Sequence, residues 1–211
     1  MMKLPTLRLL ALPLFILLAG TSQAQTTNDA SNSAAVAAAV DAPQTGMFDW
    51  VSDDIDKAEK KVEHLYDDGR LSMVLSGYAH HGRSTYTPAQ IDELNEKAWG
   101  FGFSKEMRDE KDNEESISFL VIADSHYTPQ ITAGYAYQWE KELGGGLEVG
   151  IGYTAGLISR TDIINGIPFP GILPLATFGT RDTKLVASYI PRLSGQGNGD
   201  VLYLALRIAL K

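Results

Sequence analysis

The chain has 211 residues, a formal net charge of −8 at pH 7 and no cysteine. Without cysteine it has neither a disulfide framework nor the attachment residue of a lipoprotein. The acidic balance argues against a nucleic-acid partner, because phosphate binding requires clustered Lys and Arg. Beyond the N-terminal segment no apolar run approaches the ~20 residues of a membrane helix. If the chain spans a membrane, therefore, only a closed β-barrel can satisfy its backbone hydrogen bonds.

The first residues have the order of a secretory signal peptide. A short positive stretch precedes an apolar run over residues 9–19, and small side chains follow at Ser22 and Ala24. This order predicts a signal peptide over residues 1–24 and export across the inner membrane. The alternative is an uncleaved anchor, for which the apolar run is short. Residues 25–46 are rich in Ala, Asn, Thr and Ser, a composition typical of a disordered leader.

An amphipathic helix is predicted over residues 47–68. Apolar residues recur there at spacings of three and four, which places them on one helical face: Phe48, Val51, Ile55, Ala58, Val62 and Leu65. Acid-then-base pairs four residues apart occupy the other side. The pattern suits a helix packed on a soluble core and a helix lying in a membrane interface equally well.

From residue 69 onward the hydrophobic period becomes two, as in β-strands. In residues 130–140, Ile131, Tyr135 and Trp139 share one face, and small or polar residues such as Ala136 share the other. Strands of ~10 residues with one apolar and one small or polar face are typical of transmembrane barrels. A soluble barrel would turn its apolar face inward and carry more charge outside. Eight strands are predicted, at residues 71–80, 98–107, 115–124, 131–140, 146–157, 173–179, 183–190 and 201–210.

The connections between these strands alternate in length. Long or irregular links follow the first, fifth and seventh strands, at residues 82–97, 158–172 and 191–200. Short turns follow the second, fourth and sixth, at residues 108–114, 141–145 and 180–182. Outer-membrane barrels have long external loops, short periplasmic turns and both termini in the periplasm. We therefore expect an all-β, eight-stranded antiparallel transmembrane barrel over residues 69–211, preceded by a periplasmic helix.

Polar residues at the outward ends of two strands are candidates for catalysis. His80 and His81 close the first strand, and Asp124, Ser125 and His126 close the third. A base, a hydroxyl and an orienting acid are the groups that acyl transfer needs. A metal site made from the three histidines is the competing chemical interpretation. It is disfavoured because adjacent residues of a strand point to opposite faces.

Below these residues, the third strand predicts an apolar pocket. Its inner face reads Ser116 and Ser118 in the periplasmic half, then Leu120 and Ile122 beneath the polar rim. Such an interior could hold a hydrocarbon chain, although side chains that simply fill a narrow barrel would give the same pattern. Three functions therefore remain open: an enzyme, a structural barrel or adhesin, and a barrel that binds hydrophobic ligands without chemistry.

Several short segments carry a family resemblance over about residues 47–210. They read GYAHH at 77–81, LNEKAWGFG at 94–102, ADS at 123–125, AGY at 133–135, GYTAG at 152–156, IPFP at 167–170, LPLA at 173–176 and YIP at 189–191. In this order and spacing the chain resembles the PagP-type lipid A palmitoyltransferases of the Gram-negative outer membrane. The resemblance implies an eight-stranded barrel with an N-terminal amphipathic helix, as the residue pattern predicts independently.

The resemblance also implies the reaction and its residues. A palmitoyl chain would move from the sn-1 position of a phospholipid donor to lipid A, in the outer membrane, without cofactor or metal. His81 would act as the general base, Ser125 as its partner or as the nucleophile, and Asp124 as the orienting or polarising acid. A monomer is expected.

Five further positions depart from the family pattern or keep it. The family floors its acyl pocket with a glycine, whose place Ala136 takes here, so we expect a chain somewhat shorter than palmitate. Pro174 and Pro191 keep the prolines that mark a lateral opening for lipid. At the second opening of the family, Ser76 and Ala98 stand where prolines are usual.

Overall fold

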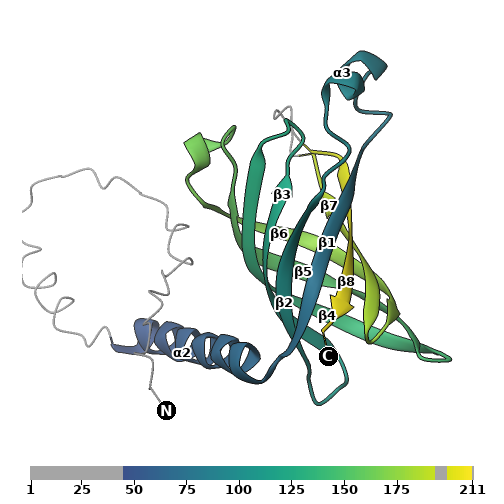
Figure 1. Cartoon of the computed structure of the whole chain (residues 1–211). Helices are drawn as coiled ribbons and strands as arrows, with labels where there is room; N and C mark the ends of the chain where they lie inside the picture. Colours follow the sequence, from purple (N-terminus) through teal and green to yellow (C-terminus); the bar gives the residue numbers. More distant parts are fainter. Residues whose placement is uncertain (1–44, 193–198, 211) are drawn as a thin grey trace, which may run out of the picture. The chain divides into compact units, whose positions relative to one another are not determined.

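The computed structural model describes residues 45–192 and 199–210 (Figure 1). Helix α2 (Thr45–Asp68) is followed by strand β1 (Arg70–His81), helix α3 (Pro88–Glu93), β2 (Gly100–Arg108), β3 (Glu114–Ala123), β4 (Pro129–Gly144) and β5 (Leu147–Ser159). A 3-10 turn, η1 (Ile164–Gly166), leads to β6 (Phe169–Thr180), β7 (Thr183–Ile190) and β8 (Val201–Ala209). The predicted signal peptide and residues 25–44 of the predicted leader lie outside the described residues.

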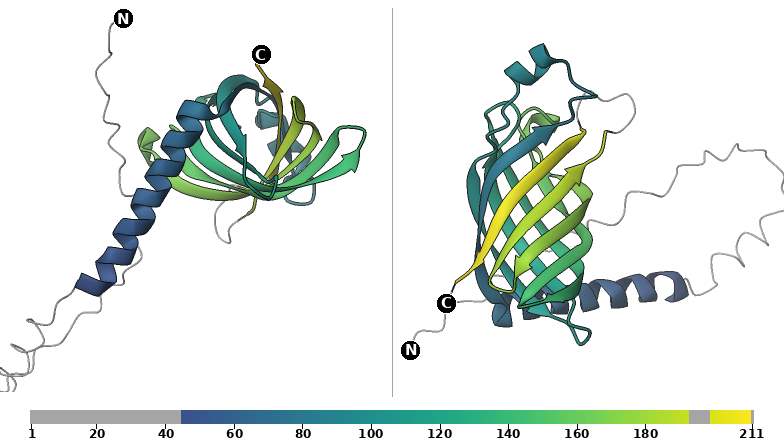
Figure 2. Two further views of the ribbon diagram at one scale, coloured as in Figure 1. Left: turned by 90° about the horizontal axis from the view of Figure 1, so that it is seen from below. Right: turned by 90° about the vertical axis from the view of Figure 1, so that its right-hand side faces the viewer.

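The strands β1 to β8 form one closed antiparallel barrel in chain order (Figures 1 and 2). β1 pairs with β8, with Val74 opposite Arg207, so the first and last strands have no free edge. A helix precedes this barrel, and the predicted fold class is confirmed.

Helix α2 includes the span predicted from the sequence, residues 47–68. The side chains of Phe48 and Val51, two members of its predicted apolar face, lie outside the described ones. Ile55 and Val62 of the same face are exposed. Among the described residues, no helix combines the length and the apolar character needed to cross a membrane.

Two strands, β4 and β6, extend four residues beyond an end that their sequence patterns predicted. β4 continues to Gly144 because it pairs with β5 as far as a turn of three glycines, all with positive φ (97°, 64° and 79°). β6 begins at Phe169, where it pairs with Ile158 of β5. The prolines of β6 hid this extension, since proline cannot donate a ladder hydrogen bond. The prolines are tolerated here because this part of β6 pairs with β5 but not with β7.

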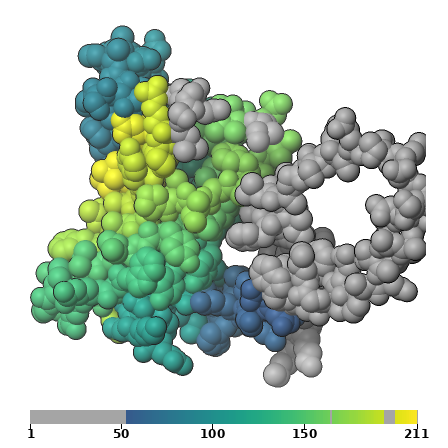
Figure 3. Space-filling view, turned by 180° about the vertical axis from the view of Figure 1, so that it is seen from behind, coloured from purple at the N-terminus to yellow at the C-terminus, as the bar shows by residue number. Residues whose placement is uncertain are grey.

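The barrel is polar inside and apolar outside. Among the described residues, 17 buried side chains are polar or charged and 8 are hydrophobic. Large apolar side chains instead cover the outer wall: Leu71, Phe101, Phe103, Phe119, Ile131, Ile151, Phe178, Leu185 and Leu206. Figure 3 shows one side of this wall, where the later strands, coloured green to yellow, face the viewer. This distribution fits a wall that faces lipid, and it would be costly for a barrel in water.

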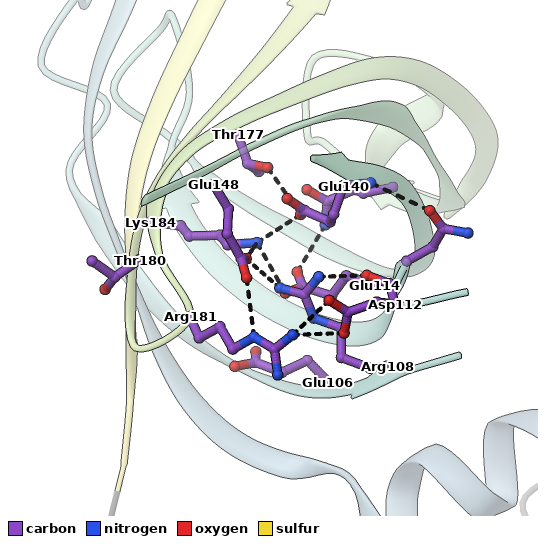
Figure 4. Close-up of polar contacts among 12 residues, drawn as sticks. Glu106, Arg108, Asp112, Glu114, Glu140, Glu148, Thr177, Thr180, Arg181 and Lys184 are labelled. Atoms are coloured by element: carbon purple, nitrogen blue, oxygen red, sulfur yellow. Dashed lines mark hydrogen bonds and ion pairs between the residues drawn. The ribbon is translucent and has the colours of Figure 1, made fainter. Parts of the chain in front are cut away.

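Charged side chains fill the lower lumen. We give the name lumen cluster to seven linked residues: Glu106, Arg108, Glu114, Glu140, Glu148, Lys184 and Arg207. Figure 4 labels all of them except Arg207. Lys184 Nζ lies 3.2 Å from Glu114, 2.6 Å from Glu140 and 3.1 Å from Glu148. Arg207 bonds both oxygens of Glu114, one of them at 2.9 Å. Each buried charge thus has an opposite partner, which offsets the cost of taking it out of water.

Candidate active site

A β-bulge decides which histidine of β1 faces the lumen. Ser76 is opposite Ala205 and Tyr78 is opposite Leu204, so Gly77 is an extra residue without a partner on β8. Uninterrupted alternation from the buried Ser76 would have turned His80 inward. The extra residue reverses the alternation, and His81 is buried with only 1% of its surface exposed. Bulges often re-aim side chains next to active sites in this way.

The imidazole of His81 meets a serine hydroxyl from another strand connection. His81 Nε2 lies 3.0 Å from Ser125 Oγ. Ser125 belongs to the turn between β3 and β4, so the contact joins two outward strand ends. A base and a hydroxyl at this distance can exchange a proton directly.

Asp124 builds the turn that presents Ser125. Its Oδ1 accepts bonds from the backbone N–H groups of His126 and Thr128, both at 2.8 Å, and its Oδ2 accepts the Thr128 hydroxyl at 2.8 Å. Asn95 secures the same turn from outside, because its Nδ2 donates to the Asp124 carbonyl at 3.0 Å. The backbone N–H of Asn95 donates to the Ser125 carbonyl at 2.9 Å. The serine is therefore held by its backbone on both sides.

The acid beside His81 is Glu96. The backbone N–H of His81 donates to Glu96 Oε1 at 3.0 Å, and the same oxygen lies 3.5 Å from His81 Nδ1. Arg83 bonds both Glu96 oxygens at 2.8 Å. Its guanidinium lowers the pKa of the Glu96 carboxyl to about 2, assisted by the His81 N–H. Glu96 is thus ionised at any physiological pH.

Hydrogen bonds join the loop between β1 and β2 to the residues that precede β8. The N–H of Gly82 donates to the Asp200 carbonyl at 2.9 Å, and the Tyr86 hydroxyl donates to the Gly199 carbonyl at 2.7 Å. The ring of Tyr86 packs edge-on against His81 at 5.5 Å between centroids. The hydrogen bonds hold the Tyr86 ring in place, and the ring restricts the orientation of the imidazole.

A cavity of about 1080 Å³ runs down the lumen from these residues. Its mouth is lined by His81 and Ser125, and its lower end by Gln138. Thr132 and Gln138 of β4 both line it, and the six residue steps between them cover about 20 Å of strand. The hydrocarbon of one bilayer leaflet is ~15 Å thick, half of a ~30 Å core. The cavity is therefore deep enough for a lipid acyl chain.

Aliphatic side chains line the middle of this cavity. They include Leu120, Ile122, Leu173 and Leu175. Ala136 also lines it, one inward position above Gln138, and only 8% of its surface is exposed. Gln138 Nε2 donates to Glu114 of the lumen cluster at 3.1 Å. An apolar shaft therefore stands on a polar, hydrogen-bonded floor.

One group of residues resembles a metal site but fits a cation poorly. Ligand atoms of Asp124, His126 and Asp162 lie within 4.8 Å of one another. Arg160 Nη2 is already 2.7 Å from Asp162 and 3.7 Å from Asp124, and it lowers the pKa of Asp162. A permanently charged guanidinium between two carboxylates takes the place that a metal ion would need.

Comparison with known proteins agrees with this geometry. The family model described as "Antimicrobial peptide resistance and lipid A acylation protein PagP" matches residues 61–207. The chain belongs to the PagP family. Among its relatives, the "Lipid A acyltransferase PagP" of Bordetella pertussis (strain Tohama I) is 40% identical over 145 residues, which cover 69% of this chain and 79% of the relative.

Two other relatives of the same name are similarly close. The Legionella pneumophila protein is 37% identical over 151 residues, covering 72% of this chain and 80% of the relative. The Methylobacillus flagellatus protein is 34% identical over 154 residues, covering 73% and 83%. Among solved structures, Neisserial surface protein A aligns with 66% of this chain and 95% of its own, at a TM-score of 0.32 and 13% identity. That similarity is too low to bear on fold or function.

In this PagP-family barrel, two seams between strands are open toward the rim. β6 pairs with β7 only from Leu175 to Gly179, although β6 begins at Phe169 and β7 runs to Ile190. Pro174 lies where this pairing stops, and its carbonyl accepts the Ser188 hydroxyl at 3.1 Å in place of a ladder bond.

The second seam lies between β1 and β2. Their pairing ends at Ser76 opposite Gly100, five residues before β1 itself ends at His81. Beyond that point the Ala79 N–H donates to the Glu96 carbonyl at 3.0 Å. The ladder is therefore interrupted here as well, although Ser76 and Ala98 are not prolines.

Of the three catalytic residues predicted from the sequence, two are in contact in the structure. His81 and Ser125 are in contact, whereas the Asp124 carboxylate is bonded to its own turn and has no recorded contact with His81 in the described part of the chain. Glu96 was not predicted, although it lies inside the family segment 94–102. Pro191 lines the cavity mouth, but Pro174 occupies an outward position of β6.

Proposed function

We propose that this chain is an outer-membrane acyltransferase. It moves a palmitoyl or slightly shorter chain from the sn-1 position of a phospholipid to lipid A. The relatives that match over most of the chain are named for lipid A acyl transfer. The observation that carries the proposal is the contact of 3.0 Å between His81 Nε2 and Ser125 Oγ at the mouth of a cavity lined by aliphatic side chains.

The contact between His81 Nε2 and Ser125 Oγ supports His81 as the group that transfers protons. As base, Nε2 takes the proton of the hydroxyl that attacks the ester carbonyl of the donor. As acid, it then returns that proton to the departing glyceryl oxygen, so that the lysophospholipid leaves neutral at this position. Ser125 is the hydroxyl already in contact with the base. It either attacks the ester itself, giving an acyl-serine that lipid A then cleaves, or it holds Nε2 toward the acceptor hydroxyl.

The cavity supplies binding and chain selection. An acyl chain seated along Leu120 and Ile122 puts its ester at the rim and its methyl end near Ala136. The donor enters sideways through the β6–β7 seam near Pro174 and Pro191, since a lipid in the leaflet cannot reach the lumen from above without leaving the membrane. The enzyme acts as a monomer and uses no cofactor.

The organisation of the rest of the chain follows from this role. Residues 1–24 are the export signal, 25–46 a leader, and 47–68 a periplasmic amphipathic helix. The short turns face the periplasm, and the rim that carries His81 faces the outer leaflet, where lipid A resides.

A transfer assay with purified protein tests the proposal. The protein is mixed in detergent micelles with lipid A and with phospholipid that carries a radiolabel in its sn-1 acyl chain. Label should move to lipid A with the wild type, and His81→Asn should lower transfer by about 10²-fold or more, the usual contribution of a general base. His80→Ala is the matched control, because its side chain points out of the barrel, and it should retain activity. Retention of the heat-dependent gel mobility of folded barrels confirms that both variants fold.

The other outcomes separate the alternatives. Tight binding of phospholipid without transfer would identify a lipid-binding barrel, and neither binding nor transfer would leave a structural protein or adhesin. Transfer at the wild-type rate by His81→Asn would remove His81 from the mechanism. Label found covalently on the protein before lipid A is added would show that Ser125 is the nucleophile.

A further inference from the structure

We propose that Glu96 is the positioning carboxylate of His81. It fixes the tautomer in which Nε2 is free to act as base, and it balances the positive charge that the ring gains during transfer. Asp124 instead serves the turn that carries Ser125. This inference rests on the proposed acyl transfer and assigns to Glu96 a role that the sequence pattern had given to Asp124.

The tautomer argument starts from the contact with Ser125. For Nε2 to accept the hydroxyl proton, the single proton of the neutral ring must sit on Nδ1. Nδ1 is buried, and in the described part of the chain no group satisfies it with a hydrogen bond. The carboxylate oxygen nearest to it in any recorded contact is Glu96 Oε1, at 3.5 Å. Glu96 Oε1 is therefore the carboxylate oxygen closest to the donor that the mechanism requires.

The charge argument concerns the imidazolium formed during the reaction. A cation on a side chain with 1% exposure is costly unless an anion is nearby. Glu96 supplies one at fixed distance, because its Oε1 is also bonded to the backbone N–H of His81 at 3.0 Å. When the ring becomes positive, closing the gap from 3.5 Å to hydrogen-bonding distance needs a shift of only about 0.6 Å.

Other charged groups near His81 disfavour a protonated imidazole, and Glu96 must offset their effect. Arg83 lies on the same loop and donates to the His81 carbonyl at 3.1 Å, and His80 is adjacent in the chain, so both oppose a positive ring. Tyr86 presents a ring edge and no anion. Arg83 also donates hydrogen bonds to both Glu96 oxygens. These bonds keep the carboxyl ionised but partly neutralise its negative charge. Glu96 is thus the single anion recorded against His81 among the described residues.

Glu96→Gln tests the proposal, because it removes the charge and keeps the size of the side chain. We expect kcat to fall about 10- to 100-fold with KM within threefold of the wild type. The acid limb of the rate profile should move down by about one pH unit, since an anion within 4–6 Å favours a protonated imidazole by at least that much. Glu96→Asp should recover part of both effects.

Two controls separate positioning from a structural role. Arg83→Gln breaks the same ion pair but leaves the carboxylate beside His81, so its kcat should stay within about threefold of the wild type. Asp92→Asn removes an exposed carboxylate from the same loop and should change nothing. If Arg83→Gln loses as much activity as Glu96→Gln without a shift of the acid limb, Glu96 only holds the loop, and the proposal is wrong.

A readout without turnover keeps this test independent of the proposed function. The His81 ring can be titrated by NMR in micelles, and its midpoint should fall by about one pH unit in Glu96→Gln. An unchanged midpoint overturns the role of Glu96 even if transfer is active. A lowered midpoint in a protein that transfers no acyl chain would support the pairing and refute only the acyltransferase.

Discussion

Replacing Lys184 with Met should lower the free energy of unfolding more than breaking any surface ion pair of the barrel does. Lys184 is 0% exposed and is shared by three carboxylates, at 3.2 Å (Glu114), 2.6 Å (Glu140) and 3.1 Å (Glu148). Arg207 still compensates Glu114 after the change, and Arg108 still compensates Glu148. Among the described residues, the side-chain hydrogen bond that Glu140 keeps is the one from the Thr177 hydroxyl, at 3.3 Å.

The expected loss follows from this stranded charge. Removing one partner of a buried ion pair costs about 3–5 kcal/mol, because the other charge stays out of water. We expect that loss in the free energy of unfolding of Lys184→Met. Adding Glu140→Gln removes the stranded charge and should restore about 1–2 kcal/mol, within the usual range of coupling between contacting residues. Transfer by the folded Lys184→Met protein should remain near normal, since Lys184 does not line the cavity.

Arg181→Met is the matched control. Arg181 also bonds Glu148, at 3.0 Å, but its side chain is 55% exposed. Exposed ion pairs contribute about 0–1 kcal/mol, so this variant should lose less than 1 kcal/mol. Urea titrations of the barrels in lipid vesicles, followed by tryptophan fluorescence and extrapolated linearly, give both values. Equal losses in the two variants would refute the argument that burial makes the lumen cluster costly to break.

Three further predictions concern the pocket, the seam and the pH range. Ala136→Gly removes a methyl group from a close-packed cavity wall, so mass spectra of the lipid A product should shift toward chains longer by about one or two methylenes; identical spectra would exclude Ala136 as the pocket floor. Cysteines at Leu173 and Ile190, which face each other if the β6–β7 register is continued, should block turnover when oxidised and restore it on reduction; full activity of the oxidised form would place lipid entry elsewhere. Because the pKa of Glu96 is depressed to about 2 from an unfolded value near 4.5, its stabilising contribution should be complete above pH 4.5 and should disappear as the pH falls through about 2. The difference in unfolding free energy between wild type and Glu96→Gln, measured from pH 6 to pH 2, should therefore shrink only below about pH 4.5.

Local patterns in the sequence were enough to predict the barrel and part of its site. The two-residue period predicted eight strands and which face of each is apolar, since side chains alternate along any strand wherever it pairs. The alternation of long and short connections placed His81 and Ser125 at one rim. Both results depend on neighbours in the chain, which the sequence displays directly.

Other features depend on partners that are distant in the chain. Glu114 and Arg207 are 93 positions apart, so the lumen cluster becomes visible only when the barrel closes. The exchange of Asp124 for Glu96 as the acid beside His81 has the same origin. Asp124 stands next to Ser125 in sequence, but its oxygens are used by its own turn, whereas Glu96 reaches His81 through the fold of the loop after β1.

The orientation of His81 shows the same limit within a single strand. Alternation predicts that His80 and His81 face opposite sides, but it does not say which of them faces inward. That choice is made by the unpaired Gly77, and a bulge exists only relative to the neighbouring strand, here β8. The register between β1 and β8 is set by closure of the whole barrel, because every strand must place its polar face in the lumen at once.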